Sequence, residues 1–398
     1  MQRRTAIVLV ALAVAAAGGA LAWSLTPTPL APAPRPGGAE LGLSLPPGFH
    51  VARWAEVDGA RSLTLAPDGT IFVGTRGAGK VYAVVPGATP GAAPRVLTLA
   101  SGLSTPNGVA VRDGALYVAE VSRILRYDGA LAKVAACVAA DASATRCALG
   151  KPAVVTDRLP RDGAHGWKFI AFGPDGALYV PVGAPCNVCR RKEPIYASIS
   201  RLDLAKEPVT PEVFASGIRN SVGFAWHPTT SELWFTDNGR DNLGDDIPPD
   251  ELDHAPRAGL DFGFPRCHGA GIPDPELGGA GACDGVTLPA VTFPAHVAAL
   301  GMRFYTASMF PERYRGGVFV AQHGSWNRST PIGYQVVFVP FGADGEPTGA
   351  VEPFLTGFRA ERGAIRGRPV DVLVAPDGAL LVSDDHGGAL YRVTYGAP

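Results

Sequence analysis

The sequence predicts an all-β protein, a six-bladed β-propeller with four-stranded antiparallel blades, and three observations lead to this fold class. One motif, two β-prone runs separated by a tight turn, occurs six times along the chain. Copies follow one another after about 45 to 90 residues, which leaves room for four strands in each unit. The high Gly (50) and Pro (37) contents of the 398 residues fit many short strands joined by turns. A β-sandwich or a two-domain arrangement is the alternative.

The six copies occur in the order LAPDGTIFVGT, VRDGALYVAE, FGPDGALYVPVG, WHPTTSELWFTDNG, RYRGGVFVAQHG and VAPDGALLVSDDHG, beginning at Leu65, Val111, Phe172, Trp226, Arg313 and Val374. Each copy places turn residues between two runs of strand formers, the strongest short-range signal for a hairpin. The earlier stretch from Phe49 to Val57 can add the outer strand of the last blade and close the ring. Because the loops on one face of a propeller meet at its channel, we expect the functional site to combine several blades.

The N-terminal residues 1–23 read as a targeting segment, with two arginines followed by an uncharged run. Small residues near its end (Ala20 to Ala22) favour cleavage as a secretory signal peptide, whereas its length also permits an uncleaved membrane anchor. The protein is therefore expected to be exported, either periplasmic or anchored to the outer side of the inner membrane. Residues 24–40 form a Pro-rich linker, and residues 41–398 form the propeller and catalytic domain.

The exported part contains an even number of cysteines, which suggests disulfide bonds in an oxidising compartment. The short separations favour the pairs Cys137–Cys147 and Cys267–Cys283 as loop staples, although the sequence does not fix the connectivity. Cys186 and Cys189 form a CxxC pair. A structural disulfide in a loop is the favoured interpretation, and a redox or metal centre is the alternative. The alternative is less favoured because the sequence has neither a second cysteine pair at zinc-binding spacing nor a thioredoxin-like context.

Polar residues gather in five loops next to the repeats. These loops are DGAHGW around His165, GIRNSVGF around Arg219 and Asn220, DNGRDNLGDDIPPDEL from Asp237 to Leu252, QHGSWNRS from Gln322 to Ser329, and RGRPVDV from Arg366 to Val372. In this order they resemble the soluble quinoprotein glucose/sorbosone dehydrogenase family. Members of that family are six-bladed propellers that bind pyrroloquinoline quinone (PQQ) and calcium and oxidise sugars. The resemblance begins near Leu43, and HGSWNRS and CNVC look most like the sorbosone-dehydrogenase-like branch.

His165 is the candidate catalytic base. Sugar oxidation by a quinone removes the anomeric hydroxyl proton while a hydride passes to the quinone, and neutral imidazole is a suitable base near neutral pH. The resemblance assigns this role to His165, with a nearby carboxylate to orient or tune it. Asp162 is the nearest acidic residue in the chain. A histidine hydrogen-bonded to the loop backbone is the simpler alternative.

Arginines are the candidate ligands of the cofactor, since PQQ is a flat ortho-quinone with three carboxylates. Arg219 and Asn220 supply a cationic fork and an amide side by side, unless Arg219 pairs with a blade carboxylate and Asn220 caps a turn. Arg368 is a second clamp. Some members of the family carry two arginines here, spaced by one residue, but this chain has Val370 at the second place. Either Arg366 compensates, or one carboxylate contact is missing.

The fifth-blade loop offers further candidates. By resemblance, a cationic residue in this region contacts the quinone, and His323 or Arg328 can serve. Trp326 either stacks on the sugar or the cofactor, or fills the channel wall. Gln322 is a further candidate for contact with the substrate. Like Arg76 and Asn107, it opens a loop that is expected to line the same face, although the support for these three residues is weaker.

The carboxylate-rich loop from Asp237 to Leu252 is the candidate calcium site. Hard oxygen ligands on an irregular loop suit Ca²⁺, and the spacing is not that of an EF-hand. The resemblance implies that the carbonyls of Gly239 and Arg240 face a cofactor-bound calcium, and that Asp250 and Glu251 hold this loop or a second ion. Arg240 stands where the family often has a proline. A solvated acidic loop is the plain alternative.

These features together predict a PQQ- and calcium-dependent dehydrogenase of an aldose or sorbosone-like sugar. Its electrons would pass to a quinone or a small redox protein, because the sequence has no CxxCH haem motif. The near-neutral net charge of -1 gives no electrostatic footprint for nucleic acid. One alternative is a calcium-dependent lactonase or hydrolase, which would not need arginines to bind the carboxylates of a cofactor. The other is a propeller that binds a ligand without catalysis, because Val370 and Arg240 depart from the family pattern.

Overall fold

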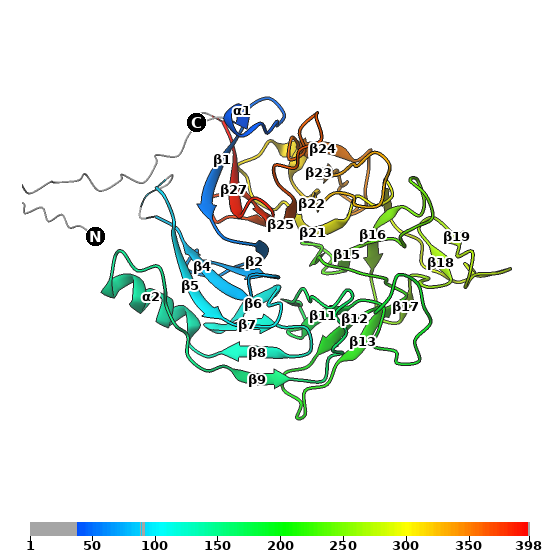
Figure 1. The fold of residues 1–398 in the computed structure, drawn as a ribbon, viewed down its shortest axis with the longest axis horizontal. Coiled ribbons are helices and arrows are strands. Elements are labelled where there is room, and N and C mark those ends of the chain that lie inside the picture. Colours follow the sequence, from blue (N-terminus) through cyan, green and yellow to red (C-terminus); the bar gives the residue numbers. More distant parts are fainter. Residues whose placement is uncertain (1–37, 88, 90–91, 397–398) are drawn as a thin grey trace, which may run out of the picture. The chain divides into compact units, whose positions relative to one another are not determined.

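The second β-prone run of each repeat folds into a strand that is buried along its whole length in the computed structural model, which describes residues 38–87, 89 and 92–396. Such a strand lies between two others of its own sheet and between the sheets of neighbouring blades, so both of its faces must be apolar. Six sheets of this kind are arranged in a ring (Figure 1). The predicted six-bladed propeller is confirmed.

The first three blades take up the N-terminal half of the ring. Their strands are β2 (Ala60–Leu65), β3 (Ile71–Thr75), β4 (Lys80–Val85) and β5 (Arg95–Ser101); β6 (Gly108–Arg112), β7 (Ala115–Ala119), β8 (Ile124–Tyr127) and β9 (Ala153–Thr156); and β10 (Ala171–Phe172), β11 (Leu178–Val182), β12 (Ser198–Leu202) and β13 (Glu212–Ser216). All pairs within these blades are antiparallel, and the short β17 (Leu260–Asp261) adds to β13 in parallel.

The last three blades complete the ring. Their strands are β14 (Phe224–Trp226), β15 (Leu233–Asp237), β16 (Asp250–Ala255) and β20 (Val291–Phe293); β21 (Ala299–Phe304), β22 (Val318–Gln322), β23 (Gln335–Val339) and β24 (Glu352–Leu355); and β25 (Pro369–Val374), β26 (Leu380–Asp384), β27 (Ala389–Tyr395) and β1 (Phe49–Glu56). The N-terminal strand β1 pairs antiparallel with β27, as the sequence predicts for closure. Phe49 fixes it by packing edge-to-face on Phe310 at 4.8 Å and on Phe354 at 5.0 Å.

Neighbouring blades approach closely at the channel, and glycine permits this approach. A Cβ atom at Gly74, at the inner end of β3, would lie 2.0 Å from the carbonyl oxygen of Asn107 in the next blade. Gly183, which follows β11, is equally restricted, because a Cβ there would lie 2.5 Å from the Cβ of His165. Any side chain at either position would push the loops around the channel apart.

The loops outside the blades carry the disulfides. Cys137, on helix α2 (Ala130–Ala140), is bonded to Cys147, and Cys267, on β18 (Cys267–His268), is bonded to Cys283. Cys186 and Cys189 are bonded to each other. All six cysteines are thus paired as the loop-staple interpretation predicts.

The remaining elements are small: the one-turn helix α1 (Gly38–Leu41), a 3₁₀ turn at Glu312–Tyr314, and β19 (Ile272–Pro273), which pairs with β18. The predicted targeting segment (residues 1–23) lies outside the described residues, as does most of the predicted linker (residues 24–40). Across the described ranges, no helix has the length and hydropathy needed to cross a bilayer.

Candidate active site

A cavity of about 280 Å³ opens where the loops of several blades meet at the channel. Its wall is polar and carries arginine, histidine and asparagine side chains from loops far apart in the sequence. Its lining includes Arg61, Arg76, His165, Trp167, Arg219, Asn220, Gly239, Asp241, Asp250, His296, His323, Trp326, Asn327 and Arg368. All five predicted loops therefore contribute to one cavity.

His165 lies in the loop before β10 with its backbone in the left-handed region, at a φ of 47°. Its Nδ1 is 2.7 Å from the carbonyl oxygen of Ala184, so Nδ1 carries the proton and donates it. The Nε2 lone pair is then left for a partner in the cavity. Burial, followed by the charge of Arg219, lowers the pKa of His165 to about 4. The imidazole is therefore neutral at physiological pH.

Asp162 does not orient this histidine. Its carboxylate accepts a hydrogen bond from the hydroxyl group of Tyr196, and the Ala184 carbonyl takes the orienting place instead. The carboxylate that acts on His165 electrostatically is Asp241 of the fourth blade. Ala184 takes this place because the chain that follows β11 brings it beside His165. Asp162 is close to His165 in sequence, but it is exposed.

Arg219 lines the cavity, but most of its fork is already bonded. Nε and Nη2 donate to the backbone and side-chain oxygens of Asn187, both at 2.9 Å, Nη2 also donates to Asp241 at 2.9 Å, and Nη1 donates to the Asn238 carbonyl at 3.1 Å. Of the five N–H groups of a guanidinium, one remains for a ligand. The alternative, in which Arg219 pairs with groups of the protein that include a carboxylate, therefore describes most of its hydrogen bonding. The side-chain amide of Asn220, within the described part of the chain, makes no hydrogen bond.

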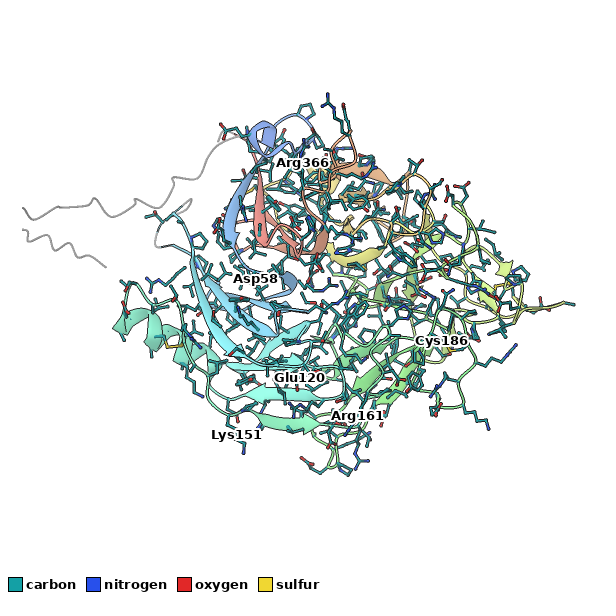
Figure 2. The ribbon with its side chains drawn as sticks, in the orientation of Figure 1. Asp58, Glu120, Lys151, Arg161, Cys186 and Arg366 are labelled. Atoms are coloured by element: carbon teal, nitrogen blue, oxygen red, sulfur yellow. A yellow bond between two sulfur atoms is a disulfide. The ribbon has the colours of Figure 1, made fainter. Side chains whose placement is uncertain are left out.

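Arg368 keeps more of its donors. Its Nε donates to the His323 carbonyl at 3.0 Å and its Nη2 to the Gly324 carbonyl at 2.6 Å, so Nη1 of this cavity-lining arginine makes no hydrogen bond within the described residues. Arg366 does not compensate for the missing second arginine. It is exposed at the edge of the propeller (Figure 2), donates to the carbonyls of Gly42 at 3.1 Å and Gly357 at 3.3 Å, and does not line the cavity.

The place of the second family arginine is apolar. Val370 is buried and packs with Val222 and Leu300, against which Trp167 also packs. Cationic charge comes from the first blade instead. The guanidinium of Arg76 lies 4.4 Å above the Trp167 ring and, among the described residues, makes no ion pair. Arg76 is therefore a stronger candidate for binding the cofactor than the sequence alone indicates.

The fifth-blade loop supplies no free cation to the cavity. His323 donates from Nε2 to Asp385 at 2.9 Å, and burial lowers the pKa of His323 to about 4, so it is neutral. Arg328 bonds the Asp245 carbonyl and pairs with Asp246 at 3.2 Å, outside the cavity wall. Both corrections follow from partners that are distant in sequence.

Two other predicted residues of this region differ in their placement. Trp326 is 71% exposed at the cavity wall, where a ligand can reach its ring. Gln322 is 1% exposed and accepts a hydrogen bond from Gln335 on the next strand, so it belongs to the blade and does not contact the cavity. Asn107 is fully buried and accepts a hydrogen bond from Arg61 at 2.6 Å.

Asp250 and Glu251 of the acidic loop brace it through backbone N–H groups, although Asp250 also borders the cavity. Asp250 accepts hydrogen bonds from the backbone N–H groups of Gly239 at 2.8 Å and Ala298 at 2.7 Å, and Glu251 accepts one from Gly269 at 2.7 Å. The loop-holding interpretation therefore describes them better than the ion-binding one. Within the described ranges, no group of three or more His, Cys, Asp or Glu residues has the arrangement of a metal site.

Gly239 and Arg240 remain the residues that fit a calcium ion. The Arg240 side chain turns away from the cavity and pairs with Asp274 and Glu276, which anchors the loop where a proline would otherwise stiffen it. No described donor bonds the carbonyl oxygen of either Gly239 or Arg240, and such free carbonyls are ligands that Ca²⁺ accepts. Burial raises the pKa of Asp250 to about 6, against the pull of its N–H partners.

Two cavity residues, Asp241 and His296, escape the sequence argument. Asp241 binds Arg219 and accepts a hydrogen bond from Asn327 at 3.0 Å, and His296 lies 3.4 Å from the same asparagine amide. Asp241 was one carboxylate among many in its loop. His296 could have been found by its position, because it stands just before the first strand of its blade, as His165 does.

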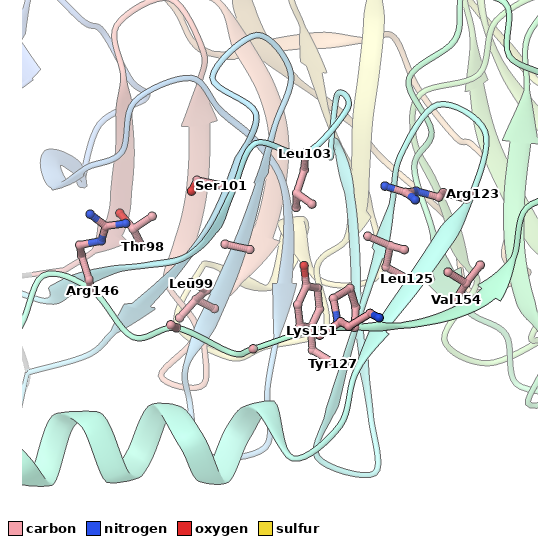
Figure 3. A pocket seen from close by; sticks show the side chains of 14 residues that line it. Thr98, Leu99, Ser101, Leu103, Arg123, Leu125, Tyr127, Arg146, Lys151 and Val154 are labelled. Atoms are coloured by element: carbon pink, nitrogen blue, oxygen red, sulfur yellow. The ribbon is translucent and has the colours of Figure 1, made fainter.

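A larger hollow, of about 510 Å³, lies between β5, β8 and the segment from residue 146 to 154 (Figure 3). Arg123, Arg146 and Lys151 line it beside Leu99 and Tyr127. Its lining contains no histidine or carboxylate that could exchange a proton. The channel cavity, with convergent polar groups and two histidines of perturbed pKa, is therefore the candidate active site.

The chain is similar to several known proteins. A family model described as TrAA12-like matches residues 279–396. An uncharacterized protein of Borreliella burgdorferi is 32% identical over 361 residues, which cover 89% of this chain and 91% of that protein. The holo form of the pyranose dehydrogenase PQQ domain from Coprinopsis cinerea shares the fold with a TM-score of 0.73 at 20% identity, over 88% of this chain and 97% of that one.

A calcium structure of the Trichoderma reesei carbohydrate-active enzymes family AA12 has a TM-score of 0.73 at 20% identity, over 89% of this chain and 97% of that one. The fold expected from the resemblance to quinoprotein sugar dehydrogenases is thereby confirmed, since these solved structures share it. The TrAA12-like model matches only the C-terminal part of the chain. The chain belongs to the same family as the uncharacterized protein of Borreliella burgdorferi.

Proposed function

We propose that the protein is a PQQ- and calcium-dependent dehydrogenase that oxidises an aldose or related sugar, with His165 as the base. One observation carries this proposal: a neutral, desolvated histidine with a free Nε2 faces the same cavity as arginines that keep unbonded N–H groups. Neutral imidazole can accept a proton, and the arginines can hold a polyanion.

The cavity residues suit the cofactor in charge and in hydrogen bonding. Arg76, the Nη1 group of Arg368 and the last N–H of Arg219 can pair with the three carboxylates of PQQ. Two further polar atoms at this wall, Nε1 of Trp167 and Oδ1 of Asn327, are buried without a partner in the described part of the chain. Buried polar atoms without partners are rare unless a ligand or water satisfies them.

Bound PQQ would supply the acceptor for the two electrons of the sugar, and Ca²⁺ on the Gly239 and Arg240 carbonyls would polarise it. His165 takes the hydroxyl proton on Nε2. The Ala184 carbonyl then stabilises the resulting imidazolium through Nδ1–H. Since a base with a pKa of about 4 is weak, the proton must leave the sugar together with the hydride.

The surroundings of the reaction are part of the proposal. We infer that the chain is exported and that a quinone or a small redox protein removes the electrons. The exposed ring of Trp326 can stack on the sugar at the entrance of the cavity. The names of two similar structures, a pyranose dehydrogenase PQQ domain and a calcium form of an AA12 enzyme, support the cofactor assignment.

A titration tests the proposal. Purified protein is mixed with PQQ and Ca²⁺, the cofactor absorbance is followed, and dye reduction is then measured with a panel of aldoses. We expect one PQQ per chain and sugar-dependent reduction of the dye, both lost on chelation of calcium. If PQQ does not bind in excess calcium, the cofactor assignment fails, and hydrolysis of lactones becomes the next assay.

A further inference from the structure

The shortest disulfide ring of the protein lies directly beside the candidate active site. Cys186 and Cys189 close a ring over only two intervening residues, in the loop that follows β11. Cys186 is labelled in Figure 2. Both cysteines are half-buried, so a reductant can reach them. The other two disulfides staple helix α2 and the β18 region, away from the cavity residues.

Asn187, inside this ring, bonds two residues of the cavity wall. It accepts hydrogen bonds from Nε of Arg219 on its carbonyl oxygen and from Nη2 of Arg219 on Oδ1, both at 2.9 Å. Its Oδ1 also accepts the backbone N–H of Asp241 at 2.9 Å, and its Nδ2 donates to the Asp241 carbonyl at 3.0 Å. One side chain thus fixes the arginine and its carboxylate partner relative to each other.

The same segment also fixes the candidate base. The Ala184 carbonyl accepts the Nδ1–H of His165 at 2.7 Å, and the Ala184 N–H donates to the Arg219 carbonyl at 2.8 Å. From residue 184 to residue 189, the chain therefore contacts His165, Arg219 and Asp241. No strand pairing restrains this segment before β12 begins at Ser198. The covalent ring limits the conformations that the loop could otherwise adopt.

We propose that the Cys186–Cys189 disulfide is a positioning element of the active site, which holds Asn187 against Arg219 and Asp241 and keeps Ala184 on His165. The inference deepens the proposed function and rests on it for the identity of the ligand. Opening the ring frees Asn187, so Arg219, which borders the cofactor cavity, loses two of its four hydrogen bonds. Binding of the anionic cofactor then weakens, although the blades stay intact.

Three variants separate this role from general stabilisation. Cys186→Ser/Cys189→Ser opens the ring, Asn187→Ala keeps the ring and removes the side-chain contacts, and Cys137→Ser/Cys147→Ser opens a disulfide outside the cavity as the control. The dissociation constant for PQQ in excess Ca²⁺ is measured for each by cofactor absorbance. We expect it to rise about tenfold or more in the first two variants, as for other supporting residues around a bound group, and to stay unchanged in the control.

A second readout needs no cofactor. In ¹⁵N spectra of the apo protein, the imidazole of His165, assigned with His165→Ala, should show the Nδ1-protonated tautomer in the wild type and in the control. We expect a mixture of tautomers in Cys186→Ser/Cys189→Ser. A disulfide that only stabilises the fold would lower the melting temperature and leave both the tautomer and the PQQ dissociation constant as they are.

The outcomes are distinguishable. The inference is overturned if Asn187→Ala and the ring-opened variant bind PQQ like the wild type and keep the His165 tautomer. If the ring-opened variant does not fold, Asn187→Ala decides by its PQQ affinity. If the wild-type protein itself does not bind PQQ, the proposed function fails, and the tautomer of His165 in the apo protein still supports or overturns the role of the disulfide.

Discussion

The two sides of the cavity each present a buried histidine, and they treat it differently. On the third-blade side, His165 donates from Nδ1 to the neutral carbonyl of Ala184 and keeps Nε2 free. On the fifth-blade side, His323 donates from Nε2 to Asp385, a carboxylate that also pairs with the buried Arg61. Burial lowers the pKa of both histidines to about 4.

The difference lies in the partner of each imidazole. Both neutral rings keep one lone pair, on Nε2 of His165 and on Nδ1 of His323, but a neutral carbonyl holds His165 whereas a carboxylate holds His323. Asp385 also pairs with Arg61, which donates to Asn107, so His323 is part of a larger hydrogen-bond network. A perturbed pKa alone would mark both as functional, so the hydrogen-bond partners must decide between a base and a positioning group.

The largest expected difference between the two histidines comes from His165→Ala. Removing the base should lower kcat by about 10²- to 10⁴-fold, measured as dye reduction with the best aldose. PQQ affinity should change little, because His165 carries no charge that binds the cofactor. The same substitution at His323 provides the matched control. Equal losses of kcat in the two variants would contradict the assignment of different roles.

The hydrogen-bond network around His323 can be disrupted at Asp385, the carboxylate that His323 contacts. Asp385→Asn removes the charge opposite the buried Arg61 and should lower the free energy of unfolding by about 3 kcal/mol, because breaking a buried pair leaves one charge uncompensated. Thermal and chemical unfolding measure it. Asp246→Asn, at an exposed pair with Arg328, is the control and should cost less than about 1 kcal/mol. Similar losses in both would show that Asp385 does not support this wall.

A third substitution sharpens the view of the cationic wall between these histidines. Arg368→Ala should weaken PQQ binding by about tenfold to a hundredfold, the loss expected for a charge-assisted hydrogen bond. Arg366→Ala, two residues earlier and exposed outside the cavity, should leave the dissociation constant unchanged. Titration by cofactor absorbance compares the two. A larger effect at Arg366 would instead support the alternative that Arg366 compensates for the missing second arginine.

The pH dependence gives the smallest effect. If His165 is the base, kcat/KM should stay level from pH 7 to about 5 and decline with an apparent pKa near 4, not near the ordinary 6.5. Because unfolding restores the ordinary pKa, the unfolded chain binds protons more tightly, and the free energy of unfolding decreases as pH falls from 6.5 toward 4. A midpoint near 6.5 for kcat/KM would contradict the desolvated base.

Local patterns in the sequence were enough for the fold. A turn between two strand-forming runs predicts each blade, and β1 could be placed on the last blade because a ring needs a closing strand. The disulfides were also within reach, since their partners are 3, 10 and 16 residues apart. Such features depend on neighbours along the chain.

The hydrogen-bond partners in the site were out of reach for the opposite reason. Arg219 looked like a free fork, but Asn187 and Asp241, 32 and 22 residues away, occupy it. Asp162 was chosen for being near His165 in the chain, while the residue that contacts the imidazole is 19 positions away at the end of β11. Sequence identified which loops meet; only the packed blades determine which atoms meet.

A single-turnover measurement tests the central claim most directly. Wild-type protein loaded with PQQ and Ca²⁺ is mixed with excess aldose without any dye, and the absorbance of the bound cofactor is followed, with loaded His165→Ala in parallel. The account predicts rapid reduction of one cofactor per chain in the wild type, and reduction slowed by about a hundredfold or more in the variant. Equal rates in the two proteins would contradict His165 as the base, and an unchanged cofactor spectrum in the wild type would contradict the dehydrogenase itself.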